Sequence, residues 1–125
     1  MSHYVKSVRQ PRMNSLQTIV KAAADIGITI VTVAELWFGA RKSARPSATR
    51  REIDAFLEPF DVLPFDAGAA EAYARTRFDL ERVGRPIGER DLLIASIGLA
   101  RGLTIVTHNL SEFARVPDLT TEDWL

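Results

Sequence analysis

The chain has 125 residues, which is enough for one domain with a single hydrophobic core and no stabilising cross-links. It contains no cysteine, which excludes disulfides and thiolate metal sites, and no apolar run approaches the roughly 18 residues of a membrane span. Sixteen basic residues balance sixteen acidic ones, so an overall basic surface for nucleic acid is excluded. We expect residues 1–125 to form one cytoplasmic domain that makes no membrane contact.

The N-terminal half alternates between helical and strand patterns. Apolar residues recur at helical spacing over 14–25, which predicts a helix. The run ITIVTV (28–33) is almost entirely β-branched, which predicts a strand that is buried on both faces. Helical patterns follow over AELWFGARKSA (34–44) and again after Ser47, the predicted N-cap of a helix that closes at Pro59.

The C-terminal half continues this alternation and ends in a polar tail. The predicted elements are a short strand VLPF (62–65), a helix from its cap Asp66 to about Val83, an apolar central helix that ends at Arg101-Gly102, a buried strand LTIVT (103–107), a short helix LSEF (110–113) and a tail DLTTEDWL (118–125). Strands separated by helices indicate βαβ units, and therefore an α/β fold with a parallel sheet flanked by helices.

Polar side chains cluster where such a sheet places its ligands, at the carboxyl ends of the strands. Glu35 follows the strand at 28–33, while Asn109 and Glu112 follow the strand at 103–107. The helix that begins near Asp91 leads into that second strand and runs antiparallel to it, so its N-terminus lies at the same end of the sheet. We therefore expect these four side chains to converge. Oxygen ligands of this kind suit Mg²⁺ or Mn²⁺, the ions of metal-dependent phosphodiester hydrolysis.

Each of these residues also has a simpler explanation. Glu35 and Asp91 could complement the dipoles of their helices, and Asn109 and Glu112 could be the N-cap and N3 partners of a capping box. Capping alone, however, does not require all four to lie at one edge of the sheet. Two arginine clusters are either solvated helix faces or a local phosphate-binding rim. They comprise Arg41, Lys42, Arg45, Arg50 and Arg51, and then Arg75, Arg77, Arg82, Arg85 and Arg90.

Several segments together carry a resemblance to a known family. They are TVAELWFGARKS (32–43), DVLPFDAGAAEAYA (61–74), GRPIGERDLLIAS (84–96), ARGLTIVTHNLSEFARV (100–116) and TTEDWL (120–125). In order and spacing they resemble the PIN-domain ribonucleases of the VapC type, which are the toxins of bacterial toxin–antitoxin pairs. The resemblance covers nearly everything from residue 28 onward, and it implies a PIN-like three-layer fold.

The resemblance also implies roles for the candidate residues. The family holds one or two Mg²⁺ or Mn²⁺ ions with an acidic quartet and cleaves RNA. Its glutamate after the first matching strand falls on Glu35, and its GRPIG-x-x-D aspartate falls on Asp91; both are implied to hold metal. Asn109 and Glu112 fall in its T-x-N-x-x-E/D-F segment, where they would orient the attacking water or complete the metal shell. Positioning of RNA phosphates is then expected of Arg41, Arg45, Arg85 and Arg90.

Partners follow from the same resemblance. The family's antitoxin wraps the toxin and inserts a basic side chain into the site, so a cognate antitoxin is expected. Homodimers are common in the family, and the large aromatics Trp37, Phe38 and Trp124 could serve such an interface. A core role for Trp37 is equally open.

The chain departs from the family at its N-terminus. The family opens with a central strand that ends in Asp-Thr-Asn and supplies a primary metal ligand, and no such strand is found before residue 28. Either residues precede this start in the native protein, or the chain is a shortened relative. Without the strand, the sheet would have two unpaired apolar edges, and metal affinity and intrinsic activity would be low. Three expectations therefore stand: a metal-dependent endoribonuclease toxin, a catalytically impaired PIN-fold module that binds an antitoxin, and a nuclease that cleaves DNA instead.

Overall fold

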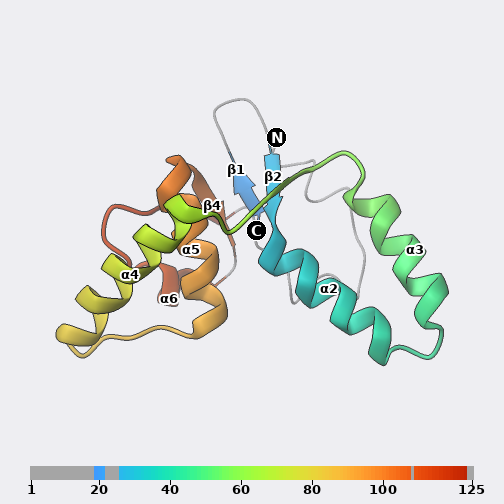
Figure 1. The fold of residues 1–125 in the computed structure, drawn as a ribbon, viewed down its shortest axis with the longest axis horizontal. Coiled ribbons are helices and arrows are strands. Elements are labelled where there is room, and N and C mark those ends of the chain that lie inside the picture. The colour runs from blue at the N-terminus through green and yellow to red at the C-terminus, as the bar shows by residue number, and fades with distance from the viewer. Residues whose placement is uncertain (1–18, 22–25, 108, 124–125) are drawn as a thin grey trace.

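The computed structural model describes residues 19–21, 26–107 and 109–123 (Figure 1). The elements in these ranges are β1 (Ile19–Lys21), β2 (Ile26–Thr29), α2 (Ile30–Lys42), α3 (Pro46–Leu57), β3 (Asp61–Leu63), α4 (Ala67–Arg82), α5 (Glu89–Arg101), β4 (Thr104–Val106), α6 (Leu110–Phe113) and β5 (Thr120–Glu122). None of the helices in these ranges combines the length and the apolar character that a membrane crossing needs.

The strands form one five-stranded sheet in the order β3-β2-β1-β4-β5. The outer pairs β2/β3 and β4/β5 are parallel, as the alternating pattern predicts. The central strand β1 is antiparallel to both of its neighbours, with Val20 opposite Gly27 on one side and Ile105 on the other. The expectation of two unpaired inner edges is therefore wrong for the described sheet, and β1 is the antiparallel exception to the expected parallel arrangement. Both inner edges are paired with the β1 backbone.

Two of the predicted elements change type in the β-branched parts of the chain. Ile19–Lys21 forms a strand within the predicted helix 14–25, whose other residues lie outside the described part of the chain. The predicted strand 28–33 ends early, at Thr29, because Thr29 caps α2: its Oγ1 accepts a hydrogen bond from the Thr32 N–H at 3.3 Å. β-Branched residues are only mildly unfavourable in a helix, so a cap and a packed face suffice to continue the run as α2.

Boundaries with strong local signals agree with the sequence. Asp66 caps α4 by accepting from the Ala69 N–H at 3.0 Å, and Gly102 ends α5 in the left-handed conformation with φ of 65°. The helix α3 starts at Pro46 rather than after Ser47, because proline is favoured in the first helical turn. The predicted tail contains β5, whose backbone pairs with β4.

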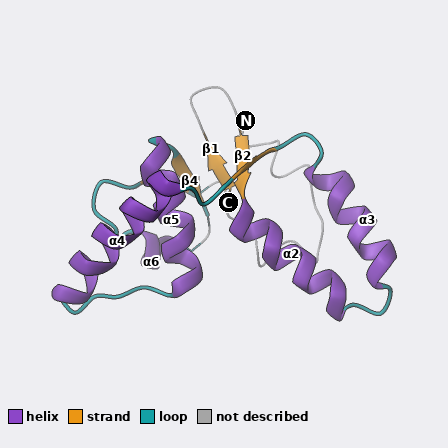
Figure 2. Cartoon of the chain, viewed as in Figure 1, coloured by secondary structure: helices purple, strands orange, loops and turns teal. Residues whose placement is uncertain are grey.

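Helices cover both faces of the sheet (Figure 2). Successive residues of a strand point to opposite faces, and β4 shows this directly. Val106 packs in a core cluster with side chains of α2 and α3, whereas Ile105 packs in a second cluster with side chains of α4, α5 and α6. The result is the predicted three-layer arrangement, with the carboxyl ends of β2 and β4 and the N-termini of α2 and α5 at one edge.

Candidate active site

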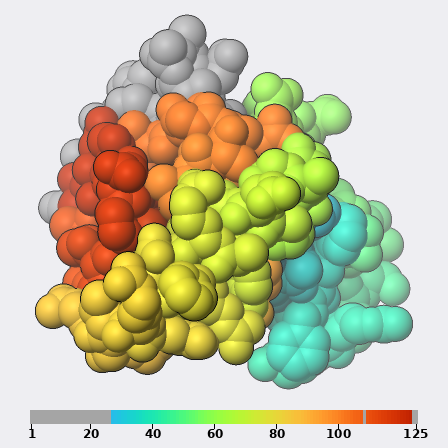
Figure 3. Space-filling model, turned by 60° about the vertical axis from the view of Figure 1, so that its left-hand side comes forward, coloured from blue at the N-terminus to red at the C-terminus, as the bar shows by residue number. Residues whose placement is uncertain are grey.

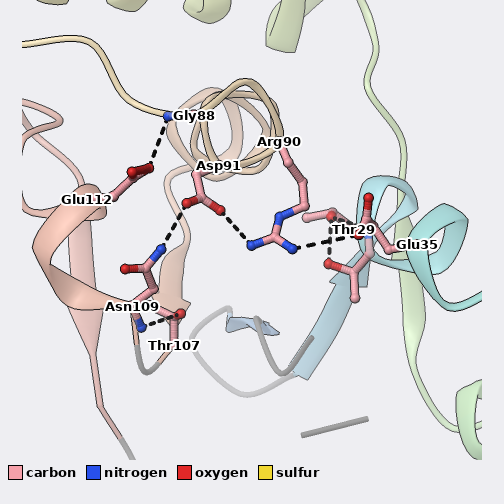
Figure 4. Close-up of polar contacts among 9 residues, drawn as sticks. Thr29, Glu35, Gly88, Arg90, Asp91, Thr107, Asn109 and Glu112 are labelled. Carbon is pink, nitrogen blue, oxygen red and sulfur yellow. Dashed lines mark hydrogen bonds and ion pairs between the residues drawn. The ribbon is translucent and has the colours of Figure 1, made fainter. Parts of the chain in front are cut away.

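The candidate active site lies at that edge, where the first turn of α5 meets the segment after β4 (Figure 4). Asp91 is the third residue of α5 and is only 5% exposed. Its burial follows from the sequence around it, because α5 is apolar on most of its sides and packs centrally in the molecule. A carboxylate in this position loses most of its contact with water and needs polar partners from the protein.

Three side chains surround the Asp91 carboxylate. Asn109 donates from Nδ2 to Oδ2 at 2.9 Å, and Arg90 donates from Nη2 to Oδ1 at 3.2 Å. Burial raises the pKa of Asp91, and a hydrogen bond with the carboxyl group of Glu112 raises it further, while the charge of Arg90 opposes both effects. The net direction is upward, which means that the charged form of Asp91 is disfavoured and that a further positive charge beside it would be stabilising.

Glu112 has the opposite pKa shift. Its Oε1 accepts a hydrogen bond from the Gly88 backbone N–H at 3.0 Å, and this bond holds the pKa of Glu112 below its usual range. The pKa values of the two neighbouring carboxyl groups are therefore shifted in opposite directions, upward for Asp91 and downward for Glu112. Where two carboxyl groups lie at hydrogen-bonding distance, a cation can take the place of a proton between them.

Glu35 lies on the other side of Arg90 from this pair (Figure 4). The Arg90 Nη1 atom is 3.7 Å from Glu35 Oε1, and both side chains are about 40% exposed, at 39% and 41%. The guanidinium thus links Glu35 to Asp91. Among the residues that the structure describes, no three carboxylate or imidazole side chains are grouped so that they could hold one metal ion. The expected convergence of four side chains is therefore met directly by three of them, and Glu35 joins through Arg90.

The simple capping explanation fails for two of the candidates. Asn109 stands at the N-cap position of α6, but its side chain makes no capping hydrogen bond there and instead contacts Asp91. Glu112 does not close a capping box, because its carboxylate accepts from Gly88, 24 residues earlier. Both side chains are held toward α5, as a joint site requires.

Some positioning contacts had no clear signal in the sequence. The buried Thr107 accepts a hydrogen bond at Oγ1 from the Asn109 N–H at 3.0 Å and so orients the turn that presents Asn109. The sequence signal that could have indicated Thr107 is a hydroxyl residue directly after a strand. Arg115 donates from Nη1 to the Pro86 carbonyl at 2.7 Å, fixing the loop that ends at Gly88. Nothing in the local pattern distinguishes Arg115 from a solvated arginine.

The predicted RNA-binding arginines lie at several places. Arg90 contacts the carboxylates, whereas Arg41 lies near the end of α2, Arg45 at the N-cap position of α3, and Arg85 in the turn after α4, all exposed. Of the predicted interface aromatics, Trp37 packs against the core and donates from Nε1 to Asp54 at 3.0 Å, and Phe38 is exposed. Trp124 lies outside the described residues.

Comparisons with known proteins identify the family. The model of the PIN domain matches residues 4–119. The chain is 46% identical over 97 residues to the tRNA(fMet)-specific endonuclease VapC of Shigella flexneri, covering 78% of this chain and 74% of that protein. It is 37% identical over 111 residues to ribonuclease VapC2 of Rickettsia felis, covering 89% and 82%.

A solved structure agrees over almost the whole chain. The structure of VapBC-1 from nontypeable Haemophilus influenzae matches with a TM-score of 0.79 at 30% identity, covering 98% of this chain and 91% of that one. The predicted PIN fold is thereby confirmed. The chain belongs to the PIN-domain family and, within it, to the VapC-type ribonucleases.

Proposed function

We propose that the protein is a metal-dependent endoribonuclease that acts as the toxin of a VapBC-type toxin–antitoxin pair and hydrolyses RNA phosphodiester bonds. The observation that carries the proposal is the carboxyl pair of Asp91 and Glu112, held with Asn109 at the carboxyl edge of the sheet. Capping of α6 does not account for Asn109 or Glu112, and two neighbouring carboxyl groups are a position that a cation can occupy.

The donor set fits a hard divalent cation. Mg²⁺ is usually bound through one or two carboxylates and keeps several waters, and the Asp91–Glu112 pair offers two. Asp91 and Glu112 would hold Mg²⁺ or Mn²⁺, with Glu35 reached directly or through water once Arg90 moves aside. When bound, such an ion lowers the pKa of a coordinated water and stabilises charge on the phosphate.

The remaining residues would orient the reactants. Asn109 donates one amide hydrogen to Asp91 and keeps its other amide atoms for an attacking water. Arg90 is half-exposed beside the carboxylates and offers a planar guanidinium that suits a phosphate oxygen pair. Arg41, Arg45 and Arg85 would contact phosphates farther along the RNA.

Substrate and partner are proposed from the relatives. A relative at 46% identity is named for tRNA(fMet) cleavage, so tRNA is the first substrate to test. A VapBC-5 structure from Mycobacterium tuberculosis, of a family described as toxin–antitoxin systems, matches with a TM-score of 0.62 at 32% identity. We therefore propose a cognate antitoxin as a partner, a homodimeric toxin and a cytoplasmic location.

The test is cleavage of total tRNA, and of matched RNA and DNA oligonucleotides, with Mg²⁺ or Mn²⁺ and with EDTA. We expect metal-dependent RNA cleavage, and we expect Asp91→Asn to lose more than about 100-fold of it, which exceeds the usual loss for an outer-shell partner. Asp79→Asn, a half-buried aspartate paired with Arg82 on α4, is the matched control and should keep full activity. Full activity of Asp91→Asn, or no cleavage by the unaltered chain, would contradict the proposal.

One observation favours a second candidate. Because no three ligand side chains are grouped among the described residues, a catalytically impaired PIN-fold module that binds an antitoxin is the alternative. This alternative predicts antitoxin binding without cleavage at any metal concentration. Calorimetric titration with MnCl₂ separates the two, since the module would bind the ion weakly and the enzyme would bind it through Asp91.

A further inference from the structure

A positively charged side chain of the protein itself lies inside the candidate active site. The Arg90 Nη2 atom is 3.2 Å from Asp91 Oδ1, and the Nη1 atom is 3.7 Å from Glu35 Oε1. Figure 4 shows the guanidinium extending from α5 toward α2, so that it lies between the two carboxylates. Arg90 therefore supplies, from within the chain, positive charge to the same carboxylates that the proposed function assigns to a divalent cation.

The guanidinium lies where an ion shared by Glu35 and Asp91 would bind. Asn109 contacts Asp91 Oδ2 at 2.9 Å, which leaves Oδ1, the oxygen that Arg90 contacts, for such an ion. Mg²⁺ binds a carboxylate oxygen at about 2.1 Å. An ion that joined Oδ1 to Glu35 would therefore lie against the guanidinium nitrogens, and the positive charges would repel each other. Arg90 and a divalent ion compete for this position.

The contacts of Arg90 suit a side chain that can leave the carboxylates. Arg90 is 39% exposed and Glu35 is 41% exposed, and ion pairs this exposed contribute little to stability. The side chain of Asp91, in contrast, is 8% exposed and has a second contact with Asn109. The planar guanidinium also matches the oxygens of a phosphate group, which can bind it in a bidentate manner. Arg90 thus has a second partner when RNA lies at the site.

We propose that Arg90 is an internal counter-ion with two positions, which links binding of the divalent ion to binding of the RNA phosphate. Without the ion, Arg90 bridges Glu35 and Asp91. When the ion binds, the guanidinium leaves the carboxylates and contacts two oxygens of a substrate phosphate. The inference rests on the proposed function and adds the regulation of its site. Because such coupling is reciprocal, the ion and the phosphate strengthen each other's binding.

A fixed ion pair is the alternative explanation of the same contacts. In that case Arg90 would only neutralise the buried Asp91, and it would remain beside Asp91 when an ion binds elsewhere at the site. Three measurements separate the two explanations: the affinity for the ion, the dependence of that affinity on a phosphodiester, and the position of the guanidinium. The fixed pair predicts that Arg90 affects neither the second nor the third.

The first measurement is the Mn²⁺ affinity without RNA, read from the electron paramagnetic resonance signal of the free ion. We expect Arg90→Gln to bind Mn²⁺ about tenfold more tightly than the unaltered chain, which is the effect that one adjacent charge has on the protonation of a carboxyl group. Arg75→Gln is the matched control and should leave the affinity unchanged. Arg75 is exposed on α4, whose yellow-green atoms lie at the surface in Figure 3. Equal affinities of Arg90→Gln and the unaltered chain would overturn the inference.

The second measurement repeats the Mn²⁺ titration with dimethyl phosphate, a phosphodiester that carries no base, against NaCl of the same ionic strength and a protein-free blank. We expect dimethyl phosphate to tighten Mn²⁺ binding by the unaltered chain about fivefold, at the lower end of usual coupling between two ligands. Direct contact between the ion and the phosphate contributes equally in Arg90→Gln, so the gain in that variant should be smaller. The same gain in both proteins would show that Arg90 couples nothing.

The third measurement reads the position of the guanidinium by nitrogen-15 NMR of the arginine side chains, with Arg90→Gln identifying the Arg90 signal. We expect saturating Mg²⁺ to move the Arg90 Nε–Hε signal to the position of a solvated arginine. The side-chain amide of Asn109, which contacts Asp91, reports that the ion is bound. An Arg90 signal that stays in place while the Asn109 signal shifts would establish the fixed ion pair and overturn the inference.

The combined outcomes separate this inference from the proposed function. Metal-dependent RNA cleavage by the unaltered chain, with a Mn²⁺ affinity that Arg90→Gln leaves unchanged, overturns the counter-ion and leaves the enzyme. Tighter Mn²⁺ binding by Arg90→Gln and a guanidinium displaced by Mg²⁺, without any RNA cleavage, support the counter-ion and overturn the enzyme. No Mn²⁺ binding by either protein overturns both.

Discussion

Asn109 and Asp91 meet across 18 residues of sequence, with Nδ2 of the amide donating to Oδ2 of the carboxylate at 2.9 Å. The contact joins the segment after β4 to the first turn of α5, and Thr107 holds the backbone of Asn109 in place. An amide at this position satisfies one oxygen of a buried carboxylate without adding negative charge. Because Asn109 is neutral, it adds nothing to the negative charge that the carboxylates of the site offer to a cation.

Asn109→Asp tests that reasoning. The substitution replaces the donor by a third carboxylate beside Asp91 and Glu112, so we expect the metal-free protein to be less stable and Mn²⁺ to bind more tightly. Asn109→Ala removes the hydrogen bond alone, and we expect it to weaken Mn²⁺ binding by about 10-fold, as for other outer-shell partners. Calorimetry and thermal unfolding in EDTA measure the two effects. Mn²⁺ affinity in Asn109→Asp no higher than in the unaltered chain would place the ion elsewhere.

Asp91→Asn should separate stability from activity. Because burial raises the pKa of Asp91 in the folded state, that state holds the proton more tightly than the unfolded chain does. The resulting stability is full below the ordinary pKa and is lost as pH rises through the raised one. At neutral pH, metal-free Asp91→Asn has no buried charge, so its Tm should exceed that of the unaltered chain.

The advantage of Asp91→Asn should shrink as the pH falls toward 4 and the aspartate becomes protonated. In addition, Mn²⁺ should raise the Tm of the unaltered chain and leave that of Asp91→Asn unmoved, since binding to the folded state alone is stabilising. Thermal scans across pH, with EDTA or MnCl₂, provide both readings. A lower Tm for the variant at neutral pH would mean that the contacts with Asn109 and Arg90 outweigh the cost of burial.

Glu112→Gln should lower the pKa of Asp91. Glu112 raises that pKa both by its charge and by its hydrogen bond, whereas a glutamine keeps an oxygen to accept from Gly88 and carries no charge. Titration of the side-chain carboxyl carbons by NMR in EDTA measures the shift directly. Glu71→Gln, an exposed position on α4, is the control and should leave Asp91 unchanged.

The fold could be predicted wherever a local signal decides the structure. Asp66 and Gly102 mark helix ends by a cap and by a left-handed glycine, and both were predicted correctly. The β-branched residues at 19–21 and 30–33 carry no such signal, because the same residues serve in a strand or in a helix. Pairing with β2 on one side and β4 on the other places Ile19–Lys21 in the sheet, and the cap at Thr29 starts α2. Both are tertiary effects.

The candidate site could be predicted as far as topology determines it. Helix and strand direction bring Asp91 and Asn109 to one edge of the sheet, and the structure joins them. The direction in which a long side chain extends is not determined by the topology of the fold. The Arg90 guanidinium lies between Asp91 and Glu35 and contacts both carboxylates, which carry the opposite charge. The sequence spacing also does not show which aromatic ring of α2 is buried; in the structure it is Trp37 that packs against the core.

Asp66 connects the beginning of α4 to the end of α5, and its two contacts can be separated. Its Oδ1 caps α4 through the Ala69 N–H, and its Oδ2 accepts from Arg101 Nη2, both at 3.0 Å. Asp66→Ala removes both contacts and should lower the free energy of unfolding by about 1 kcal/mol, the usual cost of a lost N-cap. Asp66→Asn keeps a capping oxygen, and Arg101→Gln keeps the cap entirely, so each should cost less than about 0.5 kcal/mol, because ion pairs this exposed contribute little. Urea unfolding of the three variants gives the comparison. If Arg101→Gln destabilises the protein as much as Asp66→Ala does, the link between the two helices, and not the cap, is what Asp66 contributes.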